Sequence, residues 1–330
     1  MKRFIAPLRL SLVGGGTDVP PFCDMSGSKV INFAISTFIQ AHLKTLDNST
    51  TPQIKVIIED FNGIPEENSD FGNLLGRELF SIFKIQEPLA LKIKNPVRKG
   101  SGLGTSSAMI LAAIHAVSEY LEFNLQDEKK LDLAWNVERN NMGIPGGFQD
   151  FYPAMYGGLN LISKEAGSER IKVERLDVSK SFALRLCQSI CVIEVGVERD
   201  SQSIISDQAS RAKIPNSMTQ KALKEQLRLV AEMKEALFKE DLEHVILIVE
   251  EAAYWKKRFS PLISNSTTEE IEKNLRTIGG KGVKISGAGG GGHMYCFFPE
   301  GIPQDLELRF SKSMKRLPIF IENQGIRELP

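Results

Sequence analysis

The feature that most constrains the fold is a run of small residues that leads directly into an apolar segment. Residues 100–108 read GSGLGTSSA, and residues 106–121 (SSAMILAAIHAVSEYL) are apolar on nearly all sides. A segment without a polar face predicts a helix buried inside the protein. The N-terminus of a helix offers unpaired N–H groups and the positive end of the helix dipole, which together bind phosphate. The pattern therefore favours a phosphate-binding loop over an ordinary Ser/Thr cap.

Three hydroxyl residues follow the glycines of this loop, Thr105, Ser106 and Ser107. Hydroxyl groups can donate to phosphate or ligate Mg²⁺, a hard cation that prefers oxygen. No Gly-Lys-Ser/Thr sequence closes the loop, so it is not a Walker A motif.

Size and charge narrow the classes of protein that fit. At 330 residues the chain exceeds the usual size of one hydrophobic core. Lys plus Arg and Asp plus Glu both number 41, so the basic excess typical of nucleic-acid binding is missing. No apolar run approaches the roughly 20 residues of a membrane span. Four scattered cysteines predict free buried thiols in a reduced, cytoplasmic protein. We expect small-molecule partners, with no nucleic acid and no membrane, and leave a homodimer open.

The first half of the chain reads mainly as strands and the second half mainly as helices. In residues 8–12 the leucines alternate with Arg9 and Ser11, which places these two polar side chains on the opposite face of a strand. Further strands are expected at residues 30–43, 53–59, 89–94, 184–195, 283–286 and 293–298. Helices are expected at residues 72–83, 131–140 and 218–238, from Asp241 to Trp255, and after a capping box that begins at Ser266 or Thr267. This order predicts two α+β domains, residues 1–180 and 181–330.

Two more glycine-rich loops lie near the ends of the chain. Residues 14–18 (GGGTD) follow the Arg9 strand, and Asp18 could accept hydrogen bonds from sugar hydroxyls, although a plain turn capped by Asp18 is an alternative. Residues 287–292 (GAGGGG) satisfy the GxGxxG dinucleotide fingerprint, but a strand is expected after them where that fingerprint requires a helix. We therefore expect this third loop to close over a ligand, with a hairpin turn as the alternative.

Two carboxylates lie near glycines in the middle of the chain. Glu138 ends an expected helix, and Asp150 follows Gly146-Gly147-Phe148-Gln149. Such a pair could supply a metal ligand and a base, but alone the signal is weak.

Taken together, the motifs resemble the GHMP kinase superfamily, which includes galactokinase, mevalonate kinase and homoserine kinase. The resemblance rests on residues 7–9 with 14–18, residues 102–108 and residues 284–292, which occur in the family order. Within the superfamily, residues 6–22 (APLRLSLVGGGTDVPPF), 148–152 (FQDFY) and 157–160 (GGLN) look like the bacterial D-glycero-D-manno-heptose 7-phosphate kinases. The resemblance implies ATP-dependent phosphorylation of the anomeric hydroxyl of that sugar phosphate, giving the 1,7-bisphosphate in nucleotide-activated heptose biosynthesis.

The resemblance also implies roles for individual residues. Mg²⁺ would be held by Ser106 and Glu138, and Asp150 would face the acceptor hydroxyl with Arg9 beside it. The residues implied to bind the ATP phosphates are Gly100, Ser101, Gly102, Leu103, Gly104, Thr105, Ser106 and Ser107. Those implied to bind the substrate are Asp18, Gly15, Gly16, Thr17, Gly289 and Gly290. The implied fold is α+β, an N-terminal domain like the second domain of ribosomal protein S5 followed by a ferredoxin-like domain.

The sequence departs from the family pattern in one segment, and other functions are compatible with the motifs. The lead-in to the central loop, Pro96-Val97-Arg98-Lys99, is longer and more basic than is usual in the family. A kinase for another sugar, such as L-fucose or galactose, would share every phosphate-handling residue. A nicotinamide-dependent oxidoreductase and a non-catalytic relative are remoter alternatives.

Overall fold

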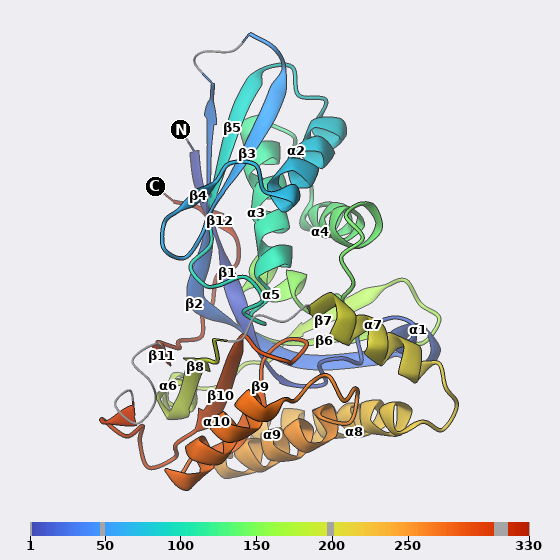
Figure 1. Ribbon diagram of the computed structural model, residues 1–330, viewed down its shortest axis with the longest axis vertical. Helices are drawn as coiled ribbons and strands as arrows, with labels where there is room; N and C mark the ends of the chain where they lie inside the picture. Colours follow the sequence, from blue (N-terminus) through green and yellow to red (C-terminus); the bar gives the residue numbers. More distant parts are fainter. Residues whose placement is uncertain (1, 47–49, 197–200, 307–315, 330) are drawn as a thin grey trace.

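Two β-sheets organise the molecule (Figure 1). The structure, a computed structural model, describes residues 2–46, 50–196, 201–306 and 316–329. The larger sheet contains eight strands: β1 (Lys2–Val13), β2 (Ser28–Thr45), β3 (Gln53–Glu59), β4 (Pro65–Glu66), β5 (Pro88–Lys94), β6 (Leu159–Lys164), β7 (Ile171–Arg175) and β12 (Arg327–Glu328). The smaller sheet contains four: β8 (Ile190–Glu194), β9 (Lys281–Ile285), β10 (His293–Phe297) and β11 (Arg316–Leu317). Two sheets with helices packed on them confirm the predicted α+β class.

The long strand β2 joins the parts of the larger sheet. Its residues 28–33 pair with β6 and its residues 40–45 pair with β5, while β1 runs antiparallel to it along the other edge. The predicted alternation along β1 is confirmed, because Leu8, Leu10 and Leu12 are buried in the core. Arg9 points to the opposite face, toward a cavity.

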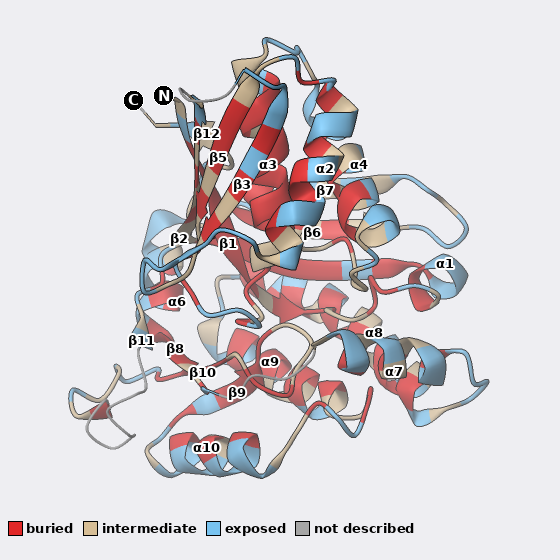
Figure 2. Cartoon of the chain, turned by 45° about the horizontal axis from the view of Figure 1, so that its top comes forward, coloured by how far each residue is buried: buried red, intermediate tan, exposed pale blue. Residues whose placement is uncertain are grey.

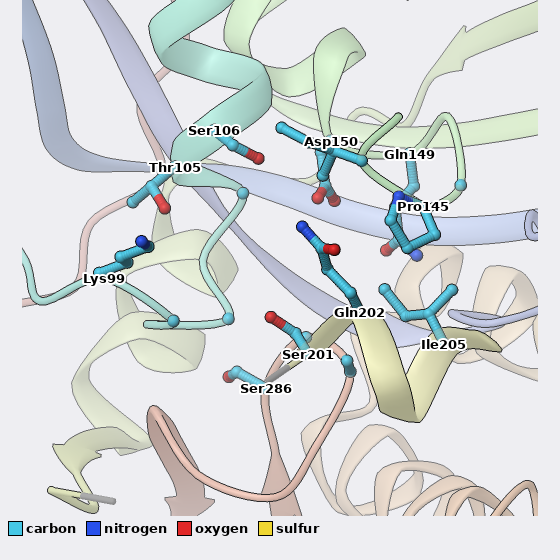
Figure 3. Close-up of a pocket in the computed structure, with 18 of the residues that line it drawn as sticks. Lys99, Thr105, Ser106, Pro145, Gln149, Asp150, Ser201, Gln202, Ile205 and Ser286 are labelled. Carbon is cyan, nitrogen blue, oxygen red and sulfur yellow. The ribbon is translucent and has the colours of Figure 1, made fainter. Parts of the chain in front are cut away.

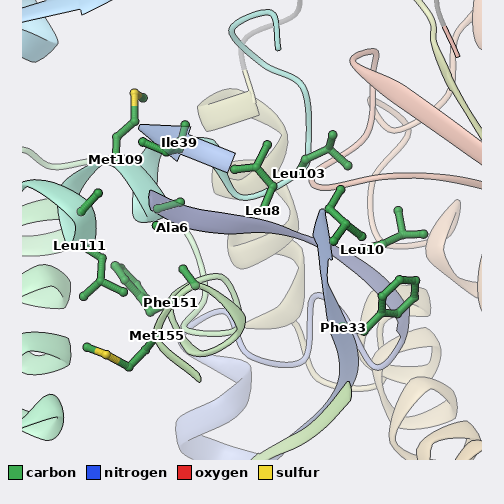
Figure 4. Close-up of a cluster of buried hydrophobic side chains, with 14 of the residues drawn as sticks. Ala6, Leu8, Leu10, Phe33, Ile39, Leu103, Met109, Leu111, Phe151 and Met155 are labelled. Carbon is green, nitrogen blue, oxygen red and sulfur yellow. The ribbon is translucent and has the colours of Figure 1, made fainter. Parts of the chain in front are cut away.

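Helices of the first half of the chain cover the larger sheet (Figure 1). They are α2 (Asp70–Phe83), α3 (Thr105–Tyr120), α4 (Asp127–Trp135), the π-helical turn η1 (Asn136–Asn141) and α5 (Phe151–Tyr156), with the short α1 (Phe22–Ser26) at the end of the first glycine-rich loop. Most residues of α3 are buried, as Figure 2 shows. The prediction of a buried helix after the central glycine loop is therefore confirmed. Leu111 of α3 lies in one hydrophobic cluster with Ala6 and Leu8 of β1 and with Phe151 of α5 (Figure 4).

The second half of the chain packs helices against the smaller sheet. They are α6 (Lys180–Ser189), α7 (Ser201–Ala212), α8 (Met218–Phe238), α9 (Leu242–Lys256) and α10 (Ser266–Thr277). Helix α8 has the predicted bounds, and Asp241 caps α9 as predicted, accepting a hydrogen bond from the His244 N–H at 3.0 Å.

Two local predictions in this half are wrong. Residues 184–195 are not one strand, because residues 180–189 form α6 and only residues 190–194 form β8. Phe182 and Leu186, four residues apart, are both buried, and Ser179 caps the helix by accepting from the Phe182 N–H at 3.1 Å. Helix α10 is capped by Asn265 with Thr268, one residue before the predicted box.

The third glycine-rich loop joins two antiparallel strands, β9 and β10. No helix follows Gly292, since residues 293–297 form β10. A dinucleotide fingerprint needs a helix N-terminus at that point, so the oxidoreductase alternative is excluded.

The core is continuous across the molecule. The hydrophobic cluster of the larger sheet also includes residues of α8, α9 and β10. A division of the chain at residue 180 therefore stays a prediction. The four cysteines are free and buried, as predicted. Among the described helices, none has the length and the apolar run of a membrane span.

Candidate active site

A cavity of about 650 Å³ lies where the three glycine-rich loops meet. Its wall includes Arg9, Gly15, Gly16 and Asp18 from the β1 end, Gly104–Ser106 from the start of α3, and Gly287 and Ala288 after β9. Gln149 and Asp150 extend into it from the loop after η1, and Ser201 and Gln202 of α7 face them from the other side (Figure 3). The structure thus brings together residues that are up to 280 positions apart in the chain.

The start of α3 opens directly onto this cavity. Gly104 is the N-cap residue, with a left-handed φ of 79°, and a Cβ atom there would lie 3.3 Å from Arg9 Cγ and 3.4 Å from Asp150 Cγ. Only glycine adopts this conformation readily while leaving room for both side chains. The N-terminus of α3, with its free N–H groups, is therefore in contact with the Arg9–Asp150 pair.

Asp150 and Arg9 form an ion pair at the cavity wall. Arg9 Nε lies 2.7 Å from Asp150 Oδ1, and Arg9 Nη1 donates to the Gly102 carbonyl at 2.5 Å. The Arg9 side chain is 5% exposed and that of Asp150 is 22% exposed. The cation is thus fixed between the central loop and the aspartate, and the carboxylate keeps an open edge toward the cavity.

Glu138 lies behind the hydroxyl groups that start α3. Its carboxylate is fully buried and accepts hydrogen bonds from the hydroxyls of Ser106 and, at 2.6 Å, Ser107. Burial raises the pKa of Glu138, while the neighbouring Arg139 cation and the two hydroxyls act in the opposite direction. This carboxylate is carried by η1, and π-helical turns inside helices are frequent at functional sites.

Arg139 connects Glu138 to the loop that carries Asp150. Its guanidinium lies 3.3 Å from Glu138 Oε2 and donates to the carbonyls of Ile144 at 3.1 Å and Gly147 at 2.8 Å. It also lies over the rings of Trp135 and Phe151, each 5.5 Å from the ring centre. No role was predicted for Arg139, although its position next to Glu138 was a signal that could have found it.

Asp18 is buried completely, unlike Asp150. Its Oδ1 accepts from the Gly16 N–H at 3.0 Å and from Gln149 Nε2 at 2.9 Å, and its Oδ2 accepts from the Gln149 N–H at 3.1 Å. Burial raises the pKa of Asp18, and the N–H groups of Gln149 and Gly16 oppose this. Gly147 packs so tightly on it that a Cβ atom there would lie 1.8 Å from Asp18 Oδ2.

The central glycine-rich loop (residues 100–104) and the third one (residues 287–292) pack backbone against backbone. A Cβ atom on Gly287 would lie 2.4 Å from Gly102 Cα, so both positions need the small size of glycine. Beyond Gly287 and Ala288 the third loop turns away from the cavity. Gly290 donates its N–H to the Ile263 carbonyl and accepts from Asn265 Nδ2, at 2.8 Å and 2.9 Å.

Several residues predicted to bind ligands lie outside the cavity wall. Gly289 packs against Ile263, and Thr17 is buried with its hydroxyl donating to the Gly14 carbonyl at 2.7 Å. The others outside the wall are Ser101, Leu103, Ser107, Glu138 and Gly290. The physical reason is common to most of them: alternate residues of a loop point inward, where they support the residues that face the cavity.

Two buried lysines at the cavity were missed by sequence reasoning. Lys256 Nζ donates to the Ile285 carbonyl at 2.9 Å and to the Gly287 carbonyl, and Lys284 Nζ donates to the carbonyls of Ser11 at 2.9 Å and Leu12 at 2.7 Å. Burial lowers the pKa of Lys256 to about 7. The signal for Lys256 was available, since it continues the buried stripe of Val245, Val249 and Ala252 on α9.

The basic lead-in to the central loop lies at the other end of the cavity. Arg98 pairs with Glu194, with Nε 2.5 Å from Oε1, and lies over the Phe61 ring. Lys99 lies near Thr105 (Figure 3), and its side chain has no hydrogen-bond partner among the described residues. Beyond them the wall includes apolar side chains, those of Ile58, Phe61, Phe71, Val97, Met109 and Met142, beside polar ones such as Asp60, Asp70 and Asn95.

The oxygen atoms at Ser106 and Glu138 are of the kind that a small divalent cation prefers; Ser106 lines the cavity and is hydrogen-bonded to the buried Glu138 carboxylate behind it. In the described part of the chain, no three His, Cys, Asp or Glu side chains gather as a metal cluster. Mg²⁺ does not need one, because it is usually held by one or two protein oxygens together with phosphate oxygens and water.

Known proteins share both the sequence pattern and the fold. Residues 73–158 match the family model described as the GHMP kinases N terminal domain. The chain is 30% identical over 303 residues to D-glycero-alpha-D-manno-heptose 7-phosphate kinase from Campylobacter jejuni, covering 89% of this chain and 88% of that protein. It is 27% identical over 305 residues to a bifunctional fucokinase/GDP-fucose pyrophosphorylase from Arabidopsis thaliana, covering 87% of this chain and 29% of that protein.

A solved structure has the same fold along the whole chain. The crystal structure of a D-glycero-D-manno-heptose 1-phosphate kinase from Bacteroides thetaiotaomicron superposes with a TM-score of 0.76 at 22% identity, covering 100% of this chain and 99% of that one. With this fold, and with a relative 30% identical over most of both chains, the chain belongs to the GHMP kinase superfamily and is a phosphotransferase that acts on an alcohol group.

Proposed function

We propose that the protein transfers the γ-phosphoryl group of ATP to the anomeric hydroxyl of D-glycero-D-manno-heptose 7-phosphate, giving the 1,7-bisphosphate and ADP. One observation carries the phosphoryl-transfer part of this proposal. The Asp150 carboxylate faces the cavity in contact with the N-terminal turn of α3, where a phosphate chain would bind. A base and a phosphate site this close to each other suit direct transfer from ATP to a hydroxyl.

The residues divide the work of the transfer. Backbone N–H groups at the start of α3, with the hydroxyl of Thr105 and the ammonium of Lys99, would hold the phosphates of ATP. Asp150 would orient the acceptor hydroxyl and take its proton while the hydroxyl oxygen bonds to the γ-phosphorus. The bond from the γ-phosphorus to the bridging oxygen breaks, and ADP leaves. Arg9 would keep Asp150 in place and lend positive charge to the transferred group.

Ser106 and Glu138 are the residues we propose to hold Mg²⁺. When bound, Mg²⁺ neutralises charge that develops on the phosphate oxygens. Glu138 would be held for this task by Arg139, which pairs with it at 3.3 Å. The apolar wall around Phe61, Phe71 and Met109 would take the adenine base.

The choice of acceptor rests on the relatives and on the acceptor end of the cavity. The C. jejuni protein carries heptose 7-phosphate in its name and matches over most of both chains. Near Asp150 the wall offers hydrogen-bonding groups on Gln149 and Gln202, as a polyhydroxyl acceptor requires (Figure 3).

A second candidate acceptor is an unphosphorylated sugar such as L-fucose. Of the cations that line the described cavity, Lys256 and Lys284 donate to backbone carbonyls, Arg9 and Arg139 are held by carboxylates, and Arg98 pairs with Glu194. Lys99 lies on the ATP side. A free cation for a second phosphate is thus not found on the acceptor side of the described wall, which favours a neutral sugar.

A coupled ADP-release assay across a small panel tests these proposals. The panel contains D-glycero-D-manno-heptose 7-phosphate, sedoheptulose 7-phosphate, L-fucose, galactose and mevalonate. We expect the mannoheptose phosphate to give the highest kcat/KM. Preference for L-fucose would replace it with the second candidate, and turnover of mevalonate alone would remove the sugar assignment.

A further inference from the structure

Gln149, on the loop after η1, is held in place by two buried polar residues. Its backbone N–H donates to Asp18 Oδ2 at 3.1 Å, and its carbonyl accepts from Asn32 Nδ2 at 3.0 Å. Its side-chain Nε2 donates to Asp18 Oδ1 at 2.9 Å. Both partners are themselves buried, Asn32 on β2 and Asp18 in the first glycine loop. The residue is therefore fixed at both ends of its backbone and at its amide.

The Asp18 carboxylate decides which way the Gln149 amide faces. Three N–H groups point at the two oxygens of Asp18, and an ionised carboxylate can only accept hydrogen bonds. The NH₂ group of Gln149 must then face Asp18, which turns the carbonyl oxygen Oε1 the other way. Within the described residues, Oε1 has no hydrogen-bond partner, and the side chain lines the cavity. The cavity is thus given a fixed hydrogen-bond acceptor.

This acceptor lies beside the reacting group. Gln149 and Asp150 are neighbours in the chain, and both side chains extend from the loop toward the cavity (Figure 3). A ligand hydroxyl at Asp150 would bring the hydroxyl on its adjacent carbon within reach of Gln149. A carbonyl oxygen accepts from a hydroxyl and discriminates against a ligand that lacks it.

We propose that Gln149 Oε1 accepts a hydrogen bond from the acceptor hydroxyl next to the reacting one, and that Asp18 acts through Gln149 as a positioning residue. The proposal rests on the proposed function, because it takes a polyhydroxyl acceptor as given. It replaces the expected direct contact between Asp18 and the sugar. Asp18 is fully buried and three N–H groups already donate to its two oxygens, so it lacks the exposure for that contact.

The test compares an acceptor with its analogue that lacks this hydroxyl, here D-glycero-D-manno-heptose 7-phosphate and its 2-deoxy derivative. We expect wild-type kcat/KM to favour the complete sugar by roughly tenfold to 100-fold, since one hydrogen bond to a fixed partner is lost. In Gln149→Met, which keeps the volume of the side chain, the ratio should fall to about 1 while the KM for ATP stays unchanged. Asp18→Asn should lower the ratio in the same way, through a misdirected amide.

A matched control and a second sugar keep the outcomes distinct. Gln208→Met removes another amide of the cavity wall, one whose Nε2 already donates to the Gly16 carbonyl at 3.0 Å, and should leave the ratio at its wild-type value. A wild-type ratio in Gln149→Met overturns the inference. If the heptose phosphate is not turned over but L-fucose is, the proposed function fails and the same ratio is measured with L-fucose and 2-deoxy-L-fucose. Turnover of neither sugar overturns both.

Discussion

The two aspartates of the cavity, Asp18 and Asp150, differ in nearly every physical respect. Asp150 is partly exposed and pairs with a cation, Arg9, at 2.7 Å. Asp18 is fully buried and is surrounded by N–H groups of two loops. A carboxylate that keeps an open edge can exchange a proton with a ligand, whereas a buried one that accepts from N–H groups of two loops holds those loops together. Asp150 is therefore suited to chemistry and Asp18 to positioning.

The largest effect is expected from Asp150→Asn. An amide cannot take the proton of the acceptor hydroxyl, so kcat should fall by about 10³-fold or more, at the upper range for loss of a general base. The Kd for ATP, measured by isothermal titration calorimetry, should stay within a few-fold of wild type, because the ATP side of the cavity is intact. A kcat within tenfold of wild type would show that Asp150 is not the general base.

The next effect is expected from Glu138→Gln. Glu138 is a buried carboxylate, like Asp18, and this variant tests whether burial alone marks a positioning residue. The amide keeps the shape but loses the charge for Mg²⁺, so kcat should fall by about 10²-fold at limiting Mg²⁺. Burial raises the pKa of Glu138, so the ionised form is disfavoured by folding, and its contribution to stability declines as pH rises from the ordinary glutamate range through the raised pKa. Urea unfolding at neutral pH should therefore show little loss, about 1 kcal/mol or less. Unchanged Mg²⁺ dependence would contradict the metal role.

A structural effect is expected from Gly147→Ala. The added Cβ would overlap Asp18 Oδ2, so the two loops must separate, and the free energy of unfolding should fall by about 2–3 kcal/mol. Gly143→Ala in the same loop is the control. Nothing lies within 4 Å of a Cβ there, and only its φ of 66° costs about 1 kcal/mol. Equal losses in the two variants would show that Asp18 is not tightly enclosed.

The smallest effect concerns pH and Lys256, whose charge both aspartates favour. Its folded pKa of about 7 lies below the ordinary value of 10.5, so between these values the unfolded chain binds more protons. The free energy of unfolding should then rise with pH in this window, by about 2 kcal/mol more in wild type than in Lys256→Met. Denaturation at pH 7 and pH 9 measures the difference, and parallel changes in both proteins would rule out this titration.

Much of the fold could be predicted from local sequence because its elements carry their own signals. Helix α8 and strand β3 have the bounds that periodicity predicts, and the all-apolar segment before Tyr120 is buried as α3. Residues 184–195 were wrongly predicted as one strand, because a short helix and a buried strand both appear as apolar runs in the sequence. Their assignment is decided by Ser179 and by pairing with β10, which lies about 100 residues away.

The residues of the candidate site likewise fall into those that local motifs predict and those that depend on the folded chain. Residues predicted from motifs, including Arg9, Gly104, Ser106 and Asp150, meet at one cavity. The role of Gln149 could not be predicted, because it depends on Asp18, 131 positions away in the chain. Arg139 and Lys256 carried a signal in the sequence, but the contact of Lys256 with the third loop is made only in the folded chain. Which of two aspartates is exposed is likewise a property of the packed loops, and no spacing in the sequence encodes it.

The most direct test of this account is kcat at saturating acceptor for Asp18→Asn, Gln149→Met and Asp150→Asn, each first shown to be folded by circular dichroism. The account predicts that Asp18→Asn and Gln149→Met raise KM for the acceptor but recover turnover within about tenfold of wild type at saturation, whereas Asp150→Asn does not recover. If folded Asp18→Asn loses turnover at saturation as completely as Asp150→Asn, then Asp18 takes part in the chemical step and the assignment of one reacting aspartate is contradicted.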